Sequence, residues 1–402
     1  MPALVLIRAF VLQPLFLLCL CIQATFAAYN MSNSLPVRID VHSHFLPPFF
    51  HDALVQAGLS KPDGMPAIPP WSTEAHLKMM ESANVKKSVL SISSPGSHLT
   101  VGDNAAGKKL TRQCNAYAAD LKERYPDKFG FWASLPLPDV DAALEEIEKA
   151  VDEGCDGFGL MTNYHGKYVG DAVFDPVFAK FNELGASVFI HPTTPCIAHG
   201  TGNNATDPKT VTKALPFGSD VPVPIFEFLF DTSRAVINLF YSGTIDRSPK
   251  IQFIIPHVGG TLPPLITRFT AFGRLVPGTK VLDPAVVRKQ IEEQFYFDLA
   301  GTVFDDASGT SGRGQLKAFV QGFDISHERL LYGTDFPFTN NGSVVMLAET
   351  MKGGLEHLFD EREREAIYEK NAEKLLDGKE REAVFEKHAE NSLQEGRIGA
   401  RI

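Results

Sequence analysis

Val37-Arg38-Ile39-Asp40-Val41-His42-Ser43-His44-Phe45 is an apolar stretch that ends in two histidines two positions apart. Successive side chains of a β-strand point to opposite faces, so His42 and His44 project to the same side. The two rings can therefore bind one metal ion together. The pair alone is a weak indication, because the chain contains 12 histidines and such a spacing also arises by chance.

Three further residues of the kinds that bind metals stand at the ends of apolar, β-branched runs. They are His191, His257 and Asp335, which end the runs 187–191, 251–257 and 330–335. The same arrangement therefore recurs four times along the chain. This repetition indicates one metal site built from the ends of several strands.

Short strand-like runs alternate with helix-like stretches, and this alternation is typical of parallel βα units. We count eight such runs, the number that closes a (β/α)8 TIM barrel: 37–44, 87–93, 129–135, 156–161, 187–191, 251–257, 295–299 and 329–334. In such a barrel, functional residues gather at the carboxyl ends of the strands, where the four runs above place their polar residues. We expect helices over 73–83, 107–125, 141–153, 224–242 and 355–376. We expect irregular loops over 58–71 and 192–215.

Composition limits the classes of partner. Hydrophobic residues make up 44% of the 402 positions and charged residues 21%, as is usual for a globular protein. The formal net charge of −10 argues against binding to nucleic acid or to an anionic membrane. An anionic substrate would need a local cation.

The barrel is expected to span residues 31–378. Residues 1–30 are expected to be a signal-like segment or an N-terminal extension, and 379–402 a polar tail. The cysteines of the body are odd in number and widely spaced, which favours a reducing compartment. We therefore expect a cytosolic protein, with entry to the secretory pathway through residues 1–27 as the alternative.

Five motifs give the chain a specific resemblance. They are Asp40-Val-His42-Ser-His44-Phe-Leu-Pro47, His191-Pro192, Pro256-His257-Val-Gly-Gly260, Tyr332-Gly-Thr-Asp335-Phe-Pro337 and Lys370-Asn371-Ala372. In order and spacing, the chain resembles the amidohydrolase superfamily over roughly residues 37–378. Within it, the chain resembles the branch of aminocarboxymuconate-semialdehyde decarboxylase, and most closely the fungal 6-methylsalicylate decarboxylases.

The resemblance implies a metal site and an acid/base pair. His42, His44, His191 and Asp335 would bind one divalent ion, with His257 and Asp335 as the catalytic groups. Imidazole and carboxylate ligands without a thiolate suit Zn²⁺, although another divalent ion can substitute. Strand four ends in Gly159-Leu-Met-Thr-Asn163 without a lysine, so we expect one ion per subunit rather than two.

The resemblance also implies a substrate-binding arginine. Arg268 matches a position from which the branch supplies an arginine across a dimer interface, so we expect a homodimer. Arginine can hold a carboxylate through two parallel hydrogen bonds. The expected partner is a small aromatic carboxylic acid. Seven aromatic residues stand near the motifs: Phe45, Phe49, Phe50, Trp71, Tyr164, Phe336 and Phe338. With 30 phenylalanines in the chain, most of them are expected to pack in the core, and those next to the ligands are expected to line a flat, apolar pocket.

The expected reaction is the non-oxidative decarboxylation of a salicylate-type acid. The resemblance points to conversion of 6-methylsalicylate to 3-methylphenol (m-cresol) and CO₂ in a fungal polyketide secondary-metabolite pathway. Hydrolysis of a lactone or amide by the same residues is the alternative, because the ligands alone do not separate the two reactions. A binding protein without catalysis is a third class, which the full set of metal-site residues disfavours.

Overall fold

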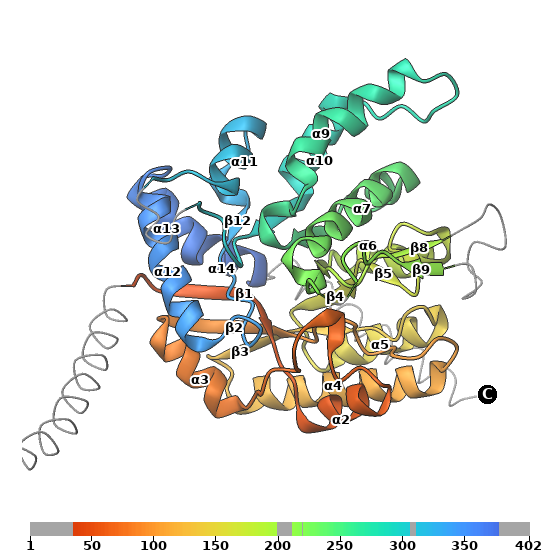
Figure 1. Ribbon diagram of the computed structural model, residues 1–402, viewed down its shortest axis with the longest axis vertical. Coiled ribbons are helices and arrows are strands. Elements are labelled where there is room, and N and C mark those ends of the chain that lie inside the picture. Colours follow the sequence, from red (N-terminus) through yellow and green to blue (C-terminus); the bar gives the residue numbers. More distant parts are fainter. Residues whose placement is uncertain (1–34, 199–210, 219, 306–310, 378–402) are drawn as a thin grey trace, which may run out of the picture.

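The computed structural model describes residues 35–198, 211–218, 220–305 and 311–377, and eight parallel strands form a barrel within them (Figure 1). Neighbouring strands follow the order β1-β2-β3-β4-β7-β10-β11-β12. Their bounds are Arg38–His44, Val85–Ser91, Phe129–Ser134, Gly157–Met161, Ser187–His191, Gln252–Ile255, Phe295–Asp298 and Leu330–Leu331. The predicted (β/α)8 barrel is confirmed. The two segments predicted at 1–30 and 379–402 lie outside the described residues.

The barrel closes between its last and first strands through backbone hydrogen bonds. The N–H of Val41 donates to the carbonyl of Tyr332 at 3.0 Å, and the N–H of Asp335 donates to the carbonyl of His42 at 2.8 Å. The strand predicted over 329–334 is regular only at Leu330–Leu331. Beyond it the backbone departs from strand geometry, and Asp335 has a φ of 57°. This closure brings Asp335 against the histidines of β1.

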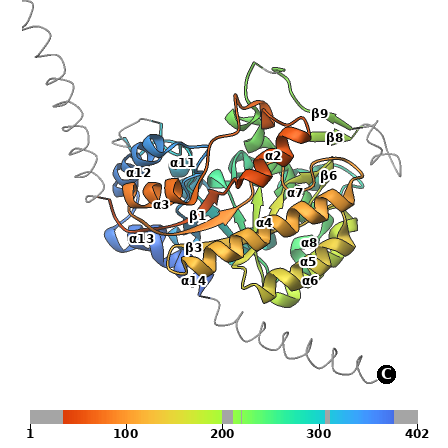
Figure 2. The same cartoon turned by 90° about the horizontal axis from the view of Figure 1, so that it is seen from below.

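Helices surround the strands, and three of the predicted ones appear within a few residues of their expected bounds. They are α3 (Thr73–Ser82), α4 (Asn104–Arg124) and α5 (Val140–Asp152). Each begins after a residue whose side chain accepts a hydrogen bond from the first turn: Ser72, Asp103 and Asp139. Figure 2 shows α4, α5 and α6 (Asp175–Leu184) as neighbours along one side of the barrel.

Other helices complete the outer layer. The helix predicted over 224–242 is found as a short 3₁₀ turn, η5 (Val223–Ile225), followed by α7 (Glu227–Ser242). Further helices along the chain are α8 (Thr244–Arg247), α9 (Leu262–Ala271), α10 (Pro284–Gln294), α11 (Gln315–Phe323) and α12 (Asn341–Glu356). Short 3₁₀ turns also occur at η2 (Ala172–Phe174), η6 (His257–Gly259), η7 (Phe272–Leu275) and η8 (His327–Arg329).

The helix predicted over 355–376 is found in part: the chain is helical from Glu361 to Leu376, but Leu355 and Glu356 belong to α12. α12 ends at Glu356, and α13 (Glu361–Glu365) begins afresh at Asp360. The side chain of Asp360 accepts from the Glu363 N–H, and the side chain of Glu363 accepts from the Asp360 N–H. This reciprocal capping box starts a new helix. The chain continues through a π-helical turn, η9 (Ala366–Lys370), into α14 (Asn371–Leu376).

The two predicted loops also contain regular structure. The loop over 58–71 includes a short turn, η1 (Pro62–Gly64), and it follows an unexpected helix, α2 (Pro48–Gln56). Within the described part of 192–215, β8 (Cys196–Ala198) pairs antiparallel with β9 (Val211–Lys213), so the prediction of a wholly irregular loop is wrong. A second small pair, β5 (Asn163–Tyr164) and β6 (Lys167–Tyr168), follows β4.

Two hydrophobic clusters hold the layers together. The smaller one draws buried side chains from seven of the eight barrel strands, which places it inside the barrel: Ile39, Val41, Val89, Trp132, Phe189, Ile254, Tyr296 and Leu331. The larger cluster lies between the strands and the helices. Among the residues that the structure describes, no helix combines the length and the hydropathy needed to cross a bilayer.

Candidate active site and metal centre

Four predicted ligands converge at one end of the barrel. His42 and His44 lie in β1, His191 ends β7, and Asp335 follows β12. One ligand atom from each of the four lies within 4.8 Å of the others. The three histidines are at most 3% exposed. The fold therefore forms a buried His/Asp cluster from residues nearly 300 positions apart.

Hydrogen bonds at Nδ1 orient the three histidine rings. The partners of Nδ1 are Asp298 Oδ2 for His42 at 2.9 Å, Ser91 Oγ for His44 at 2.9 Å, and the Pro192 carbonyl for His191 at 2.7 Å. A ring that donates from Nδ1 keeps Nε2 as its lone-pair nitrogen. Such support of the second nitrogen is usual for metal-binding histidines, since it fixes both tautomer and orientation.

The atoms at the centre of the cluster fit a cation. His42 Nε2 is buried and has no hydrogen-bond partner. It lies 3.5 Å from Asp335 Oδ1, and His44 Nε2 lies 3.1 Å from the same oxygen. A buried polar atom left without a partner is costly, and a metal ion would satisfy it. Three imidazoles and one carboxylate therefore suit a divalent ion.

The charges of the metal-free site also favour binding of a cation. Burial lowers the pKa of His42, but the neighbouring carboxylates of Asp298 and Asp335 outweigh it and raise that pKa to about 9. Burial also tends to raise the pKa of Asp335, but the hydrogen bond from His44 and the charge of His42 hold it below its usual value. Without metal, a proton on His42 thus balances the acids. Metal binding must displace that proton.

Asp298 is a site residue that the sequence analysis missed. This side chain ends β11, is fully buried, and accepts the backbone N–H groups of His257 and Ala300 at 3.1 and 3.0 Å as well as the His42 ring. Burial raises its pKa, but the charge and hydrogen bond of His42 outweigh this and lower it overall. Asp298, His42 and His257 also form a second group with metal-binding spacing. The signal that pointed to Asp335, an acid at the end of a predicted strand, applies equally to Asp298.

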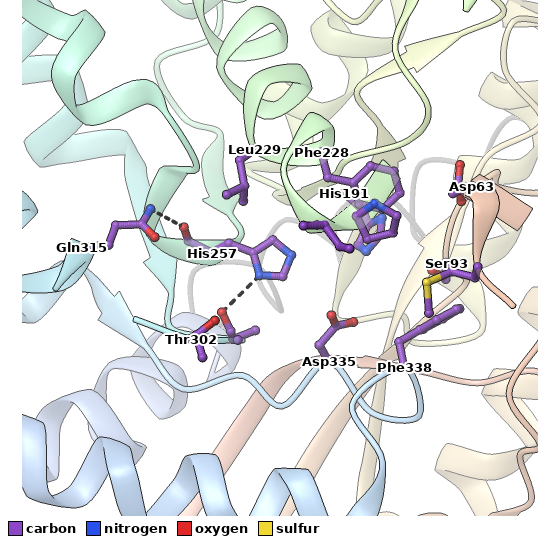
Figure 3. Close-up of a pocket in the computed structure, with 15 residues that line it drawn as sticks. Asp63, Ser93, His191, Phe228, Leu229, His257, Thr302, Gln315, Asp335 and Phe338 are labelled. Atoms are coloured by element: carbon purple, nitrogen blue, oxygen red, sulfur yellow. Dashed lines mark hydrogen bonds between the residues drawn. The ribbon is translucent and has the colours of Figure 1, made fainter. Parts of the chain in front are cut away.

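His257 stands beside the cluster rather than in its four-residue set. Its backbone has a φ of 54°, and its ring centroid lies 5.0 Å from that of His42. Its Nδ1 lies 3.1 Å from the Ala300 carbonyl, and the Gln315 side chain donates to the His257 carbonyl at 3.0 Å. Figure 3 shows the imidazole pointing into the pocket. His257 is therefore held from behind with Nε2 left for chemistry.

The cluster opens into a cavity of about 190 Å³. His191, His257 and Asp335 line it together with apolar side chains, which include Phe228, Leu229 and Phe338. Of the seven aromatic residues near the motifs, Phe338 lines the cavity and the others pack in or against the hydrophobic core, as expected for most of them. Phe45 and Phe336, which adjoin His44 and Asp335, are also in the core and not on the cavity wall. The helical residue Phe228 of α7 was not anticipated. The cavity thus combines a polar metal edge with apolar walls, as small-molecule sites usually do.

Arg268 lies away from the cavity of its own chain. It is exposed on α9, and its guanidinium carbon lies 3.8 Å from the centroid of the Phe272 ring. Among the described residues that line the cavity there is no lysine or arginine. Within one subunit, the structure therefore does not bring Arg268 to the other predicted site residues.

Comparison with known sequences gives a consistent picture. A profile of the amidohydrolase family matches residues 39–378. Decarboxylase yanB of Aspergillus niger is 35% identical over 323 residues, which cover 79% of this chain and 81% of that protein. The 6-methylsalicylic acid decarboxylase of Penicillium expansum is 35% identical over 305 residues, which cover 75% of this chain and 85% of that protein. The superfamily resemblance found in the sequence motifs is confirmed.

Solved structures share the architecture. The crystal structure of an amidohydrolase II superposes with a TM-score of 0.71 at 29% identity and covers 85% of this chain and 99% of that chain. A 5-carboxyvanillate decarboxylase from Novosphingobium aromaticivorans, complexed with manganese and a nitrobenzoic acid, superposes with a TM-score of 0.66 and covers 85% of this chain and 96% of that chain. At 20% identity, the second likeness shows the fold alone.

Proposed function

The chain belongs to the amidohydrolase family, and from that premise we propose that it is a metal-dependent, non-oxidative decarboxylase of salicylate-type acids. The proposed reaction converts 6-methylsalicylate to 3-methylphenol and CO₂. The observation that carries the proposal is the buried His/Asp cluster opening into a small, largely apolar cavity with His257 on its wall. The named activity of the relative from Penicillium expansum supports the choice of substrate.

His42, His44, His191 and Asp335 would hold one divalent ion. We propose Zn²⁺, because nitrogen-rich sites with one carboxylate suit it, and the manganese in the solved relative makes Mn²⁺ the competing choice. Bound there, the ion would act as a Lewis acid toward the carboxylate and the ortho hydroxyl of the substrate. Loading the protein with each metal in turn and measuring turnover decides between them.

The remaining chemistry is proton delivery. Direct loss of CO₂ from an aromatic ring would leave an unstable aryl anion, so the carbon that carries the carboxylate must be protonated first. His257 is the proposed donor from Nε2, because its Nδ1 is engaged by Ala300 and it is not one of the four ligands. CO₂ then leaves as the C–C bond electrons restore the aromatic ring. Asp335 is the alternative donor, although two histidines already contact it.

The His257→Asn variant tests this role. We expect CO₂ release to fall by at least about 100-fold, since general acids typically contribute factors of 10² to 10⁴. Metal content, measured on the same sample, should stay at the wild-type level. Retention of most turnover with metal fully bound would rule out His257 as the donor.

Product analysis separates decarboxylation from hydrolysis. Incubation with 6-methylsalicylate should yield 3-methylphenol and one CO₂ per substrate, without ¹⁸O from labelled water in the phenol. Ring opening of a lactone, with incorporation of labelled oxygen, would favour the hydrolase instead. If metal-loaded protein forms neither the decarboxylation product nor the hydrolysis product, both enzymatic functions are contradicted.

We further propose a homodimer in which Arg268 anchors the substrate carboxylate in the cavity of the partner. The cavity lacks a cation of its own among its described lining residues, and an anionic substrate needs one. Figure 1 shows α9 and α10 projecting from the barrel. Exposed apolar side chains follow Arg268 on this arm, among them Leu275, which is 74% exposed. Such apolar exposure is typical of a surface that another subunit covers.

Mixing two inactive variants tests whether Arg268 acts across the interface. Arg268→Ala and His257→Asn are each expected to be nearly inactive. If Arg268 serves the partner's site, mixed dimers hold one intact site, and random reassociation restores about one quarter of wild-type activity. If it serves its own site, or if the protein is monomeric by light scattering, no activity returns.

A further inference from the structure

A second carboxylate, that of Asp63, lines the same cavity as the metal cluster. It comes from η1, a turn between α2 and α3 that contributes no predicted ligand. Figure 3 shows Asp63 on the opposite side of the pocket from His257 and Gln315. The cavity therefore has an acidic group on a wall remote from the proposed proton donor.

The local structure holds Asp63 in this place. Its backbone adopts a φ of 53°, a left-handed conformation that Asp tolerates better than most residues. The hydroxyl of Thr194, which follows β7, donates to Asp63 Oδ1 at 2.5 Å. The next residue, Gly64, lies close to the backbone of Pro222, just before η5. A Cβ atom at Gly64 would be 3.5 Å from the Pro222 Cα. The acid is thus fixed by contacts from two other segments.

The surroundings favour a hydrogen-bonded acid rather than an ion pair. Burial raises the pKa of Asp63, while hydrogen bonds from Thr194 and Ser94 and the charge of Lys213 oppose the rise. A carboxylate offers about four lone-pair positions, so these two hydroxyl donors leave acceptor capacity for a ligand. The other cavity residues near this wall, Ser93 and Met65, carry no charge.

We propose that Asp63 determines substrate specificity by accepting a hydrogen bond from a second hydroxyl on the substrate ring. This inference rests on the proposed function. The carboxylate and the ortho hydroxyl of a salicylate would be used at the metal edge, so a group that meets Asp63 must be a further ring substituent. A carboxylate in that position strengthens the binding of a substrate with a hydroxyl there. It weakens the binding of one with only a C–H, and it repels a second carboxylate. The preferred substrates are dihydroxylated monocarboxylic acids, with 6-methylsalicylate accepted at lower efficiency.

The test compares 6-methylsalicylate (2-hydroxy-6-methylbenzoate) with its 4-hydroxy and 5-hydroxy derivatives. The quantity measured is the ratio of kcat/KM for each hydroxylated acid to that of the parent. The intrinsic reactivity of each ring affects wild type and variant equally. It therefore cancels when the ratio for the variant is compared with the ratio for wild type. For at least one derivative, Asp63→Asn and Asp63→Gly should lower the ratio by about tenfold, mainly through KM, since hydrogen bonds to charged groups are worth about this factor. Glycine suits the left-handed backbone at this position, and asparagine preserves the side-chain shape.

Two controls separate recognition from a structural role. Asp52→Asn removes an exposed carboxylate on α2, outside the cavity, and should leave every ratio unchanged. Thr194→Val removes one support of Asp63 but keeps its carboxylate, so the ratio should fall less than in the Asp63 variants. A purely structural role would instead reduce kcat/KM equally for all three acids.

Binding to the wild-type protein gives a readout independent of variant folding. The product analogue 5-methylbenzene-1,3-diol should inhibit about tenfold more strongly than 3-methylphenol. Equal inhibition together with unchanged ratios in both Asp63 variants would overturn the inference while the proposed function stands. If metal-loaded wild type releases CO₂ from none of the three acids, both are wrong.

Discussion

At the scale of single residues, the hydrogen bond between Asp298 and His42 fixes the orientation of a ligand in the His/Asp cluster. Both side chains are fully buried, and Nδ1 of the ring lies 2.9 Å from Oδ2 of the acid. The same carboxylate accepts the backbone N–H of His257. One acid therefore aligns a metal ligand and the proposed proton donor together.

Asp298→Asn should weaken metal binding without removing a ligand from the four-residue cluster. The amide keeps the shape of the carboxylate but loses its charge, so it orients the imidazole less strongly. Loss of such a supporting group typically costs 10- to 100-fold in metal affinity, which competition with a chromogenic chelator measures. Asp52→Asn serves as the control for a removed carboxylate. Equal affinity in Asp298→Asn and wild type would contradict this role.

At the scale of elements, the start of α13 shows how one cap interrupts a charged segment. The capping box of Asp360 and Glu363 separates α13 from α12, although the residues on both sides favour helix. Without the cap, nothing local would forbid a continuous helix over 355–376. The capped break turns the chain so that the last helices pack beneath β1 and β12, which α14 contacts.

Asp360→Ala distinguishes the two arrangements by the sign of its effect. In the observed structure the change removes a cap and should lower the free energy of unfolding by about 1 kcal/mol. In a continuous helix the same change would introduce the best helix former and raise stability. Urea unfolding of variant and wild type measures the difference. A stabilised variant would contradict the break.

Glu146 of α5 links two outer helices and should make stability depend on pH. It is buried and accepts hydrogen bonds from Asn115 and Arg112 of α4, each at 2.7 Å. Burial raises its pKa above the usual 4.5, and these partners offset the rise only in part. Because the folded-state pKa is raised, the contribution of Glu146 is fully present below the unfolded-state pKa. It is lost as the pH rises through the folded-state value.

Glu146→Gln removes this titration. The stability of the variant relative to wild type should therefore increase from about pH 4 to about pH 8. Unfolding by urea at both pH values gives the two differences, in which the titration of groups far from Glu146 cancels. Glu145→Gln is the matched control of opposite sign, because Glu145 is exposed on the same helix and its hydrogen bond from Lys108 lowers its pKa, so the relative stability of this variant should not rise between the two pH values. If the difference in free energy of unfolding between Glu146→Gln and wild type is the same at both pH values, burial does not shift the pKa of Glu146.

At the scale of the whole molecule, the barrel turns distant strand ends into one site. The ligands come from β1, β7 and the segment after β12, so the cluster exists only when the ring of strands is closed. A metal ion that binds this cluster binds the folded state and not the unfolded chain. Folding and metal binding are therefore linked.

Removal of the metal should lower both activity and thermal stability. After dialysis against a chelator, we expect CO₂ release to be lost and Tm to fall by several degrees, because ligand binding to the native state raises the free energy of unfolding. Adding back Zn²⁺ or Mn²⁺ should restore both. A Tm unchanged by metal removal and return would contradict binding at a cluster that spans the barrel.

The sequence by itself determined the barrel and most of its polar edge. Alternation of strand-like and helix-like runs is a local pattern, and all eight barrel strands lie close to their predicted positions. His42, His44, His191 and Asp335 were found because each stands at the end of a strand-like run, and parallel strands in a barrel end at the same rim. Spacing along the chain was sufficient for these residues.

Only the tertiary structure decided which groups meet across the barrel. The contact between Asp298 and His42 joins residues 256 positions apart, and Asp63 reaches the cavity from a turn with no strand-end pattern. The exclusion of most motif aromatics from the cavity likewise follows from packing, since identical rings serve either the core or a pocket wall. Local patterns fix where a strand ends, whereas the closure of the ring and the packing of loops against it fix what each end faces.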